Sequence, residues 1–325
     1  MSSASAPGKV ILFGEHAVVY GRPAIAVPVP EVCARATVEK GTQRQGIWIH
    51  APDLEVSHHL GDVVVRGEAA FALEATVRNV LRNLGCPDMP DLTITVTSTV
   101  PVASGMGSGA AVATAMVRAL AQHLGASLST EEVSALVFAT EVIHHGTPSG
   151  IDNTVVSYAN PIYFVRSSPI ELLHVRRPFN LVIADTGVRS PTRVAVEDVR
   201  RSWEADRQRF EAVFDRIGMI AALARRAIET GQSGSLGGLM NQNQELLREI
   251  GVSSPELEKL ISAALAAGAE GAKLCGAGRG GNMVALVSRN GAGKVAASVR
   301  AAGAVQVITT QVRQTPAPSR SGAGE

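Results

Sequence analysis

The sequence contains little of what would mark several special classes of protein. Only three cysteines occur among its 325 residues, Cys33, Cys86 and Cys275, and they lie far apart. Such scarce and odd-numbered cysteines suit a reducing compartment and form neither a disulfide framework nor a metal-binding cluster. The net charge is only +1, so the chain has no strong electrostatic attraction to nucleic acid or to anionic membranes.

Long apolar runs are also missing. The first residues show no basic segment followed by an apolar one, and no uninterrupted apolar stretch is long enough to cross a membrane. Hydrophobic residues make up 46% of the chain and charged residues 18%, which is typical of a globular protein with a large core. We therefore expect a cytoplasmic protein of two closely packed lobes, with neither nucleic acid nor a membrane as partner.

The stretch from Val100 to Val112 changes from a strand pattern, through glycines, to a helix pattern. Residues 92–97 alternate apolar and polar side chains, and apolar residues then recur every four positions from Val112 to Leu124. A glycine loop that enters a helix presents unpaired N–H groups and the positive end of the helix dipole to an anion. The stretch predicts a phosphate-binding loop, although a tight turn that binds nothing also fits these residues.

The first third of the chain reads mostly as strands. An apolar run over residues 9–13 breaks at Gly14, Glu15 and His16 and resumes at 18–20 and 24–27. This pattern predicts paired strands joined by a charged turn, which either faces a cleft or is simply solvated. Further strands are expected at 34–38, 47–49 and 63–65, followed by a helix over 69–84.

Two acidic residues follow the central loop. A capping box of Ser129 and Glu132 opens a helix that runs to residue 145 and carries Glu141 near its end. Residues 146–154, which are bounded by glycine and proline, predict a loop that contains Asp152. Two acids near a phosphate loop suggest one to hold Mg²⁺ and one to take a proton from a hydroxyl group. A surface acid on a helix and an Asx-turn residue remain the alternative.

The second half is richer in helix. A strand at 181–184 precedes helical patterns to about residue 230, at 236–250 and from Ser254, and a second glycine loop lies within 272–287 between two strands. A helix at 294–302 and a strand at 305–309 complete an antiparallel sheet backed by helices, which is close to half of a ferredoxin-like arrangement. We expect an α+β protein with an N-terminal domain at 1–180, a C-terminal domain at 181–314 and a disordered tail at 315–325.

Three segments, at 5–21, 101–111 and 273–282, resemble in order the three motifs of the GHMP kinase superfamily. Residues 141–153 and 240–244 with Gly251 and Val252 look like its mevalonate kinase family in particular, so the similarity spreads from about residue 5 to 290. The resemblance implies a two-lobed GHMP kinase fold, with an N-terminal mixed α/β lobe and a helix-rich, ferredoxin-like C-terminal lobe. It also implies Mg²⁺ and ATP-dependent phosphorylation of the 5-hydroxyl of mevalonate to 5-phosphomevalonate in isoprenoid precursor synthesis, and suggests a homodimer.

The resemblance also assigns roles to single residues. Asp152 would be the general base, with Lys9 beside it favouring the ionised carboxylate, and Glu141 would bind Mg²⁺. The positions that match nucleotide-binding residues are Ser98, Ala103, Ser104, Gly105, Met106, Gly107, Ser108 and Gly109. The positions that match the substrate side are Glu15, His16, Thr192, Gly276 and Ala277.

The chain departs from the family pattern in two motifs. Gly109 stands where the family usually has a serine that binds the metal, so Ser108, a water molecule or Glu141 alone would have to hold Mg²⁺. Arg279 and Asn282 stand where the family usually has glycine and cysteine. The guanidinium of Arg279 could contact a phosphate or a carboxylate, but we expect it to point to solvent.

Other functions share the same motifs. A GHMP kinase for phosphomevalonate, a sugar or homoserine would keep the ATP loops and differ in the acceptor pocket. A decarboxylase is disfavoured because Lys9, Glu141 and Asp152 together follow the kinase pattern. A ligand-binding member of the superfamily without catalytic activity is the alternative from a different class, and the missing hydroxyl of Gly109 is consistent with it.

Overall fold

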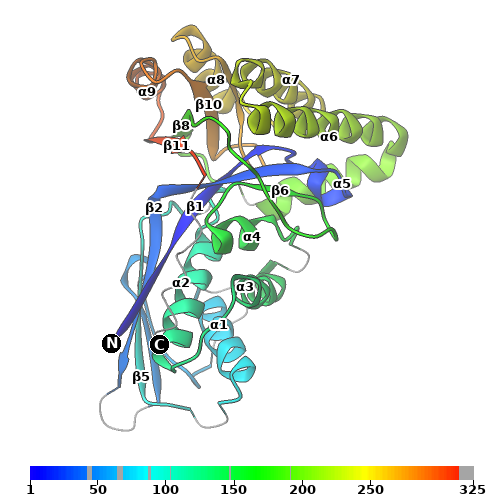
Figure 1. Cartoon of the computed structure of the whole chain (residues 1–325). Coiled ribbons are helices and arrows are strands. Elements are labelled where there is room, and N and C mark those ends of the chain that lie inside the picture. Colours follow the sequence, from blue (N-terminus) through cyan, green and yellow to red (C-terminus); the bar gives the residue numbers. More distant parts are fainter. Residues whose placement is uncertain are drawn as a thin grey trace.

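The computed structural model describes residues 1–41, 46–63, 69–86, 89–102, 104–145, 148–190 and 192–314. Its N-terminal half is built on a seven-stranded sheet in the order β4-β3-β5-β2-β6-β7, with β1 paired to β2. The strands are β1 (Ser2–Phe13), β2 (Ala24–Lys40), β3 (Ile47–Ala51), β4 (Val56–His59), β5 (Leu92–Ser98), β6 (Ile162–Phe164) and β7 (Glu171–Leu172). Four helices cover one face of this sheet (Figure 1): α1 (Ala69–Asn83), α2 (Ser108–His123), α3 (Thr130–His145) and α4 (Ile151–Tyr158).

The C-terminal half is built on a four-stranded antiparallel sheet in the order β11-β8-β10-β9. Its strands are β8 (Phe179–Asp185), β9 (Gly271–Leu274), β10 (Asn282–Val287) and β11 (Gln306–Val312). Its helices are α5 (Thr192–Ala205), α6 (Arg207–Thr230), α7 (Leu236–Glu249), α8 (Pro255–Ala266) and α9 (Ala292–Ala301). The first and fourth strands of this half are neighbours at one side, as in a ferredoxin-like sheet, so the expected α+β class is confirmed.

Small residues bring α2 close to the sheet. Alanines fill the buried face of this helix, among them Ala111 and Ala115, and α2 packs directly against β1 and β2. The start of α3 is fixed by the predicted capping box, in which the backbone N–H of Ser129 donates to Glu132 Oε2 (2.7 Å) and the N–H of Glu132 donates to Ser129 Oγ (3.2 Å). These contacts set the directions of the two helices whose ends form the site described below.

Helix α7 covers the free side of edge strand β9. The side chain of Asn241 accepts a hydrogen bond from the backbone N–H of Ala272 (3.0 Å), and that of Gln244 accepts one from the N–H of Leu274 (2.9 Å). Two amide side chains on α7 therefore take the place of a fifth strand and satisfy backbone donors that an edge strand normally leaves open.

Two local predictions were wrong. Residues 17–20 form a short 3-10 helix, η1 (Ala17–Tyr20), because His16 and Gly21 on either side of it adopt left-handed backbone conformations that end the strand pattern. Asp152 lies in the first turn of α4 instead of in a loop, because Gly150, at φ +91°, turns the chain and lets Ile151 and Val155 reach the core.

Some predictions are not tested by the structure. Val63 is exposed and outside any strand, and the other two residues of the strand expected at 63–65 lie outside the described residues. The tail at 315–325 also lies outside them. The division at residue 180 stays a prediction. Across the described ranges, no helix has both the length and the hydropathy needed to cross a membrane.

Candidate active site

The central glycine loop presents the N-terminus of α2. Gly105 and Gly107 have positive φ angles of 82° and 72°, which glycine adopts without strain, and Ser104 Oγ donates to the carbonyl of Pro101 (3.0 Å). Gly107 occupies the N-cap position and has no side chain to bond the first N–H groups of α2. These donors, together with the helix dipole, remain available to an anion, as a phosphate-binding loop requires.

Lys9 on β1 runs directly beneath this loop. Its backbone N–H donates to the carbonyl of Met106 (3.0 Å), and a Cβ at position 107 would lie 2.9 Å from Lys9 Cγ, so glycine is required there. The Lys9 side chain is 3% exposed, and its Nζ lies 2.8 Å from Asp152 Oδ1. Burial alone would lower the pKa of Lys9, but the attraction of Asp152 and other nearby acidic groups raises it, so the amine stays protonated.

Two carboxyl groups meet at this lysine. Asp152 projects from the first turn of α4 with its side chain one-third exposed, while Glu141 comes from the last turns of α3. Burial, and next to it the negative charge of Asp152, raise the pKa of Glu141 to about 8, although Lys9 pulls it down. The structure thus brings together Glu141 and Asp152 with Lys9, which precedes both of them by more than 130 positions in sequence.

The donor set fits Mg²⁺ held jointly with a nucleotide. Among the described residues, no group of three or more His, Cys, Asp or Glu side chains could hold a metal alone. Mg²⁺ in nucleotide sites is usually bound by one or two carboxylates together with phosphate oxygens. A partly buried carboxyl whose ionised form is disfavoured by burial and by a second acid would be stabilised by such a cation, and Glu141 has these properties.

The charged turn after β1 is buried rather than open. Glu15 is 1% exposed and forms an ion pair with the fully buried Lys273 of β9, which also donates to the carbonyl of Leu274 (2.6 Å). Burial raises the pKa of Glu15 even though Lys273 opposes this effect. The turn therefore joins the two halves of the molecule through a buried ion pair. The spacing of residues in the sequence did not predict this pair.

His16 makes a second connection between the halves. Its Nε2 lies 3.0 Å from the carbonyl oxygen of Ala277, and because a carbonyl only accepts, Nε2 must carry the proton. Burial lowers the pKa of His16 to about 4, so the ring is neutral at physiological pH. The second glycine loop, which contains Gly276 and Ala277, is thus attached to the turn that follows β1.

The two glycine loops lie against each other. A Cβ at Gly105 would be 4.0 Å from the Cα of Gly276, and Asn282 Nδ2 donates to the carbonyl of Ser104 (2.7 Å). Asn282 is 2% exposed, so this hydrogen bond is shielded from water. The predicted combination of two loops at one site is therefore present, and Asn282 connects them where the family usually has cysteine.

The remaining predicted positions lie farther along these elements. Ser98 ends β5, where its N–H donates to Asp53 Oδ2 (2.7 Å) and its Oγ accepts from the N–H of Val100 (3.1 Å). Ser108 and Gly109 begin α2, and Thr192 is the exposed first residue of α5. Ala103 lies outside the described residues.

The expectation that Arg279 points to solvent was wrong. Its Nη1 donates to Asp198 Oδ2 on α5, and its Nε lies 3.4 Å from the carbonyl of Gly251. The carboxylate that it contacts belongs to the chain itself and lies 81 positions away in sequence. Spacing within the glycine loop could not have predicted this partner.

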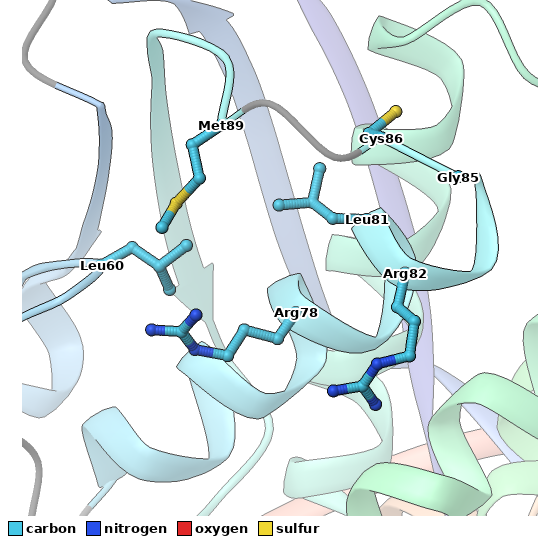
Figure 2. A pocket seen from close by; sticks show the side chains of 7 residues that line it. All are labelled: Leu60, Arg78, Leu81, Arg82, Gly85, Cys86 and Met89. Carbon is cyan, nitrogen blue, oxygen red and sulfur yellow. The ribbon is translucent and has the colours of Figure 1, made fainter.

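A separate pocket lies at the far end of α1 (Figure 2). It has a volume of about 490 Å³ and is lined by Leu60, Arg78, Leu81, Arg82, Gly85, Cys86 and Met89. No residue predicted for the active site lines this pocket. The converging charges and the open helix N-terminus, rather than the pocket, mark the candidate active site.

The comparisons with known proteins agree with this geometry. Residues 71–160 match the GHMP kinases N terminal domain and residues 219–305 match the GHMP kinases C terminal domain. The chain is 36% identical to the mevalonate kinase of Pyrococcus furiosus, over 96% of both chains. It is also similar to the crystal structure of L. major mevalonate kinase in complex with R-mevalonate, at 30% identity, a TM-score of 0.82, and coverage of 98% of this chain and 97% of the other.

A more distant structure supports the fold alone. Methanococcus jannaschii mevalonate kinase is 22% identical and has a TM-score of 0.81, with coverage of 96% of this chain and 98% of the other. A phosphomevalonate kinase of Streptococcus pneumoniae reaches the same TM-score at 14% identity. The fold is therefore shared by kinases for different acceptors, so the function has to be inferred from the local geometry of the site.

Proposed function

The chain belongs to the mevalonate kinase family of the GHMP kinases, and on this premise we propose that it transfers the γ-phosphate of ATP to the 5-hydroxyl of mevalonate. The products are 5-phosphomevalonate and ADP, a step in isoprenoid precursor synthesis. One observation supports this proposal above the others. The protonated amine of Lys9 and the two partly exposed carboxyl groups of Asp152 and Glu141 converge beside a glycine loop at a helix N-terminus.

Asp152 is the proposed general base. Its carboxylate accepts the proton of the attacking hydroxyl as the oxygen–phosphorus bond forms and the bond to the leaving ADP breaks. Lys9 pairs with Asp152 through the 2.8 Å contact and offsets negative charge on the nucleophile and on the transferred phosphoryl group. Because Lys9 is held beneath Gly107, its amine is fixed in position before any substrate binds.

The glycine loop is the proposed nucleotide site. The backbone N–H groups of residues 104–109 and the N-terminus of α2 would bind the phosphates, and Ser98 and Ala103 are the further positions that we assign to the nucleotide. Glu141 would hold Mg²⁺, assisted by the hydroxyl of Ser108 because Gly109 has none. A metal ion held there would supply positive charge that offsets the negative charge developing on the phosphate groups during transfer.

The acceptor side of the site is assigned to the turn after β1 and the second glycine loop. The proposed positions are Glu15, His16, Thr192, Gly276 and Ala277. Glu15 Oε2 is buried and has no hydrogen-bond partner within the described residues, so it is an acceptor that an ordered water molecule would satisfy. A cytoplasmic location and a homodimer complete the proposal.

Release of ADP from Mg²⁺-ATP tests the acceptor. The purified protein is assayed with mevalonate, 5-phosphomevalonate, homoserine, galactose and no acceptor. Release with mevalonate alone is expected. Release only with another member of the panel would refute the acceptor and keep the kinase, whereas ATP binding without release across the panel would favour a binding protein without catalytic activity.

The variant Asp152→Asn tests the mechanism. It keeps the size and polarity of the side chain but removes the base, so kcat should fall by roughly 10² to 10⁴ while ATP affinity stays within about threefold. Asp215→Asn is the matched control, because Asp215 is an exposed acid on α6 that pairs with Arg22 at the surface. A kcat of Asp152→Asn within tenfold of the unmodified enzyme would exclude Asp152 as the base.

A further inference from the structure

Arg279 adopts a backbone conformation that favours glycine. Its φ angle is +60°, in the left-handed region, where a residue with a Cβ is strained and glycine is not. Its neighbours Gly278 and Gly280 also have positive φ angles, and a Cβ at either would lie within 2.5 Å of a carbonyl oxygen. The side chain of Arg279 is therefore present at a conformational cost, which calls for a compensating contact.

The contacts that compensate for the strained backbone of Arg279 are made with two segments outside the second glycine loop. The guanidinium pairs with Asp198 in the second turn of α5, and the backbone N–H of Arg279 donates to the carbonyl of Val252 (2.7 Å) between α7 and α8. The pair is partly shielded, with side-chain exposures of 37% for Arg279 and 24% for Asp198. A charge-assisted hydrogen bond in such a position is stronger than a fully exposed ion pair.

A second contact attaches the same loop to the segment before α5. The N–H of Gly281 donates to the carbonyl of Val188 (2.9 Å), and the N–H of Thr186 donates to the carbonyl of Gly281 (2.9 Å). The attachments at Val188 and at Asp198 stand on either side of Thr192, the first residue of α5. The start of α5 is thus held to the second glycine loop on both sides.

We propose that Arg279 is a positioning residue for the acceptor, which acts by holding the start of α5, and with it Thr192, against the second glycine loop. This inference rests on the proposed function, in which that loop and Thr192 line the acceptor side. Within the described residues, the hydrogen bonds of Arg279 reach α5 and the α7–α8 connection, and none goes to residues 104–109 of the phosphate loop. The side chain therefore affects binding of the acceptor and leaves binding of ATP unchanged.

The variant Arg279→Gly is the first test. Glycine relieves the backbone strain, so the variant should fold at least as well as the unmodified protein, and the side-chain contacts to Asp198 and to the carbonyl of Gly251 are lost. The KM for mevalonate should rise roughly three- to tenfold, and the KM for ATP should stay within twofold. Arg200→Ala is the matched control, because it removes an ion pair with Glu204 that lies wholly on α5, and it should change neither constant.

Reversal of the charges separates the tether from a general loss of structure. Arg279→Asp alone places two carboxylates together and should raise the KM for mevalonate more than glycine does. Aspartate also tolerates the left-handed conformation better than most residues. Because Asp198 also pairs with Arg201, the double variant Arg279→Asp with Asp198→Arg is made together with Arg201→Ala, where it restores the attraction and should bring the KM back to within about threefold of that of Arg201→Ala alone. Failure of this rescue would overturn the proposal.

Hydrogen exchange in the ligand-free protein tests the tether between Arg279 and α5 separately from the role of Arg279 in acceptor binding. Arg279→Gly should speed exchange of backbone amides in the first two turns of α5 at least fivefold, whether or not a substrate is known. Unchanged exchange would overturn the tether. Faster exchange combined with equal rises in both KM values would overturn the acceptor role, and absence of mevalonate-dependent ADP release from the unmodified protein would overturn the proposed function and the acceptor role together.

Discussion

Replacement of Glu15 by glutamine should destabilise the protein strongly. The ion pair between Glu15 and Lys273 joins the turn after β1 to β9, and both side chains are fully buried. Glutamine keeps the shape and one oxygen acceptor but removes the charge, so the ammonium group of Lys273 is left in the interior without compensation. Loss of one partner of a buried pair typically costs about 3–5 kcal/mol.

Removal of both charges should lower the free energy of unfolding far less than removal of the Glu15 charge alone. The double variant Glu15→Leu with Lys273→Met replaces two desolvated ions by apolar side chains of similar volume, a change that is often nearly neutral. The carbonyl of Leu274 then loses the hydrogen bond from Lys273, for which we allow about 1 kcal/mol. The double variant should therefore be more stable than Glu15→Gln by about 2 kcal/mol or more.

Urea unfolding at pH 8 measures these differences. The two tryptophans serve as probes, because Trp48 lies on β3 in the N-terminal sheet and Trp203 lies on α5 in the C-terminal half. With a urea m value of about 3 kcal/mol/M, the transition of Glu15→Gln should move down by about 1 M or more. Because the pair connects the halves, the transitions seen by single-tryptophan versions should also separate.

The exposed pair of Glu171 and Arg225 provides the control. Its carboxylate is 47% exposed, so Glu171→Gln should cost less than about 1 kcal/mol. A loss for Glu15→Gln no larger than this control, or a double variant less stable than the single one, would show that the buried pair does not stabilise the junction.

Two further predictions concern the site. Gly109→Ser meets no atom within 4 Å of its new Cβ and replaces a poor helix former in the first turn of α2, so stability should rise by about 0.5 kcal/mol. If the missing hydroxyl weakens metal binding, this variant should also reach half-maximal activity at several-fold lower Mg²⁺, and an unchanged Mg²⁺ titration would show that Gly109 is not the cause. His16, whose pKa burial lowers to about 4, resists protonation in the folded state, so its contribution to stability is present above pH 6.5 and is lost as the pH falls towards 4. Between pH 6.5 and 4, the free energy of unfolding of His16→Gln should fall by roughly 3 kcal/mol less than that of the unmodified protein, as measured by thermal unfolding. An equally steep fall in the variant would contradict the lowered pKa of His16.

Features encoded by near neighbours were predictable from the sequence. The two partners of the capping box, Ser129 and Glu132, are only three residues apart. The glycine loops are recognisable because glycine is required in only a few backbone conformations. The ferredoxin-like sheet follows from the order of its elements. Asp152 was misplaced in a loop because the burial of Ile151 and Val155, which makes α4 helical, depends on packing against the rest of the molecule.

Partners that are distant in sequence were not predictable from spacing. Glu15 and Lys273 are 258 positions apart, and Lys273 sits within an apolar strand where a charged residue has no local explanation. Arg279 has its partner on a helix whose orientation is set by the whole C-terminal half. The meeting of Lys9, Glu141 and Asp152 was expected only from the family resemblance, because three separate elements have to pack before it exists.

The two amide side chains of α7 along β9 bear on how copies of this chain could associate. A β-sheet grows between molecules when an edge strand offers free backbone donors and acceptors to an incoming strand. On β9, the N–H groups of Ala272 and Leu274 are already bonded to Asn241 and Gln244, and α7 occupies the space that such a strand would need. A second copy of the chain therefore cannot extend the C-terminal sheet by adding a strand along β9.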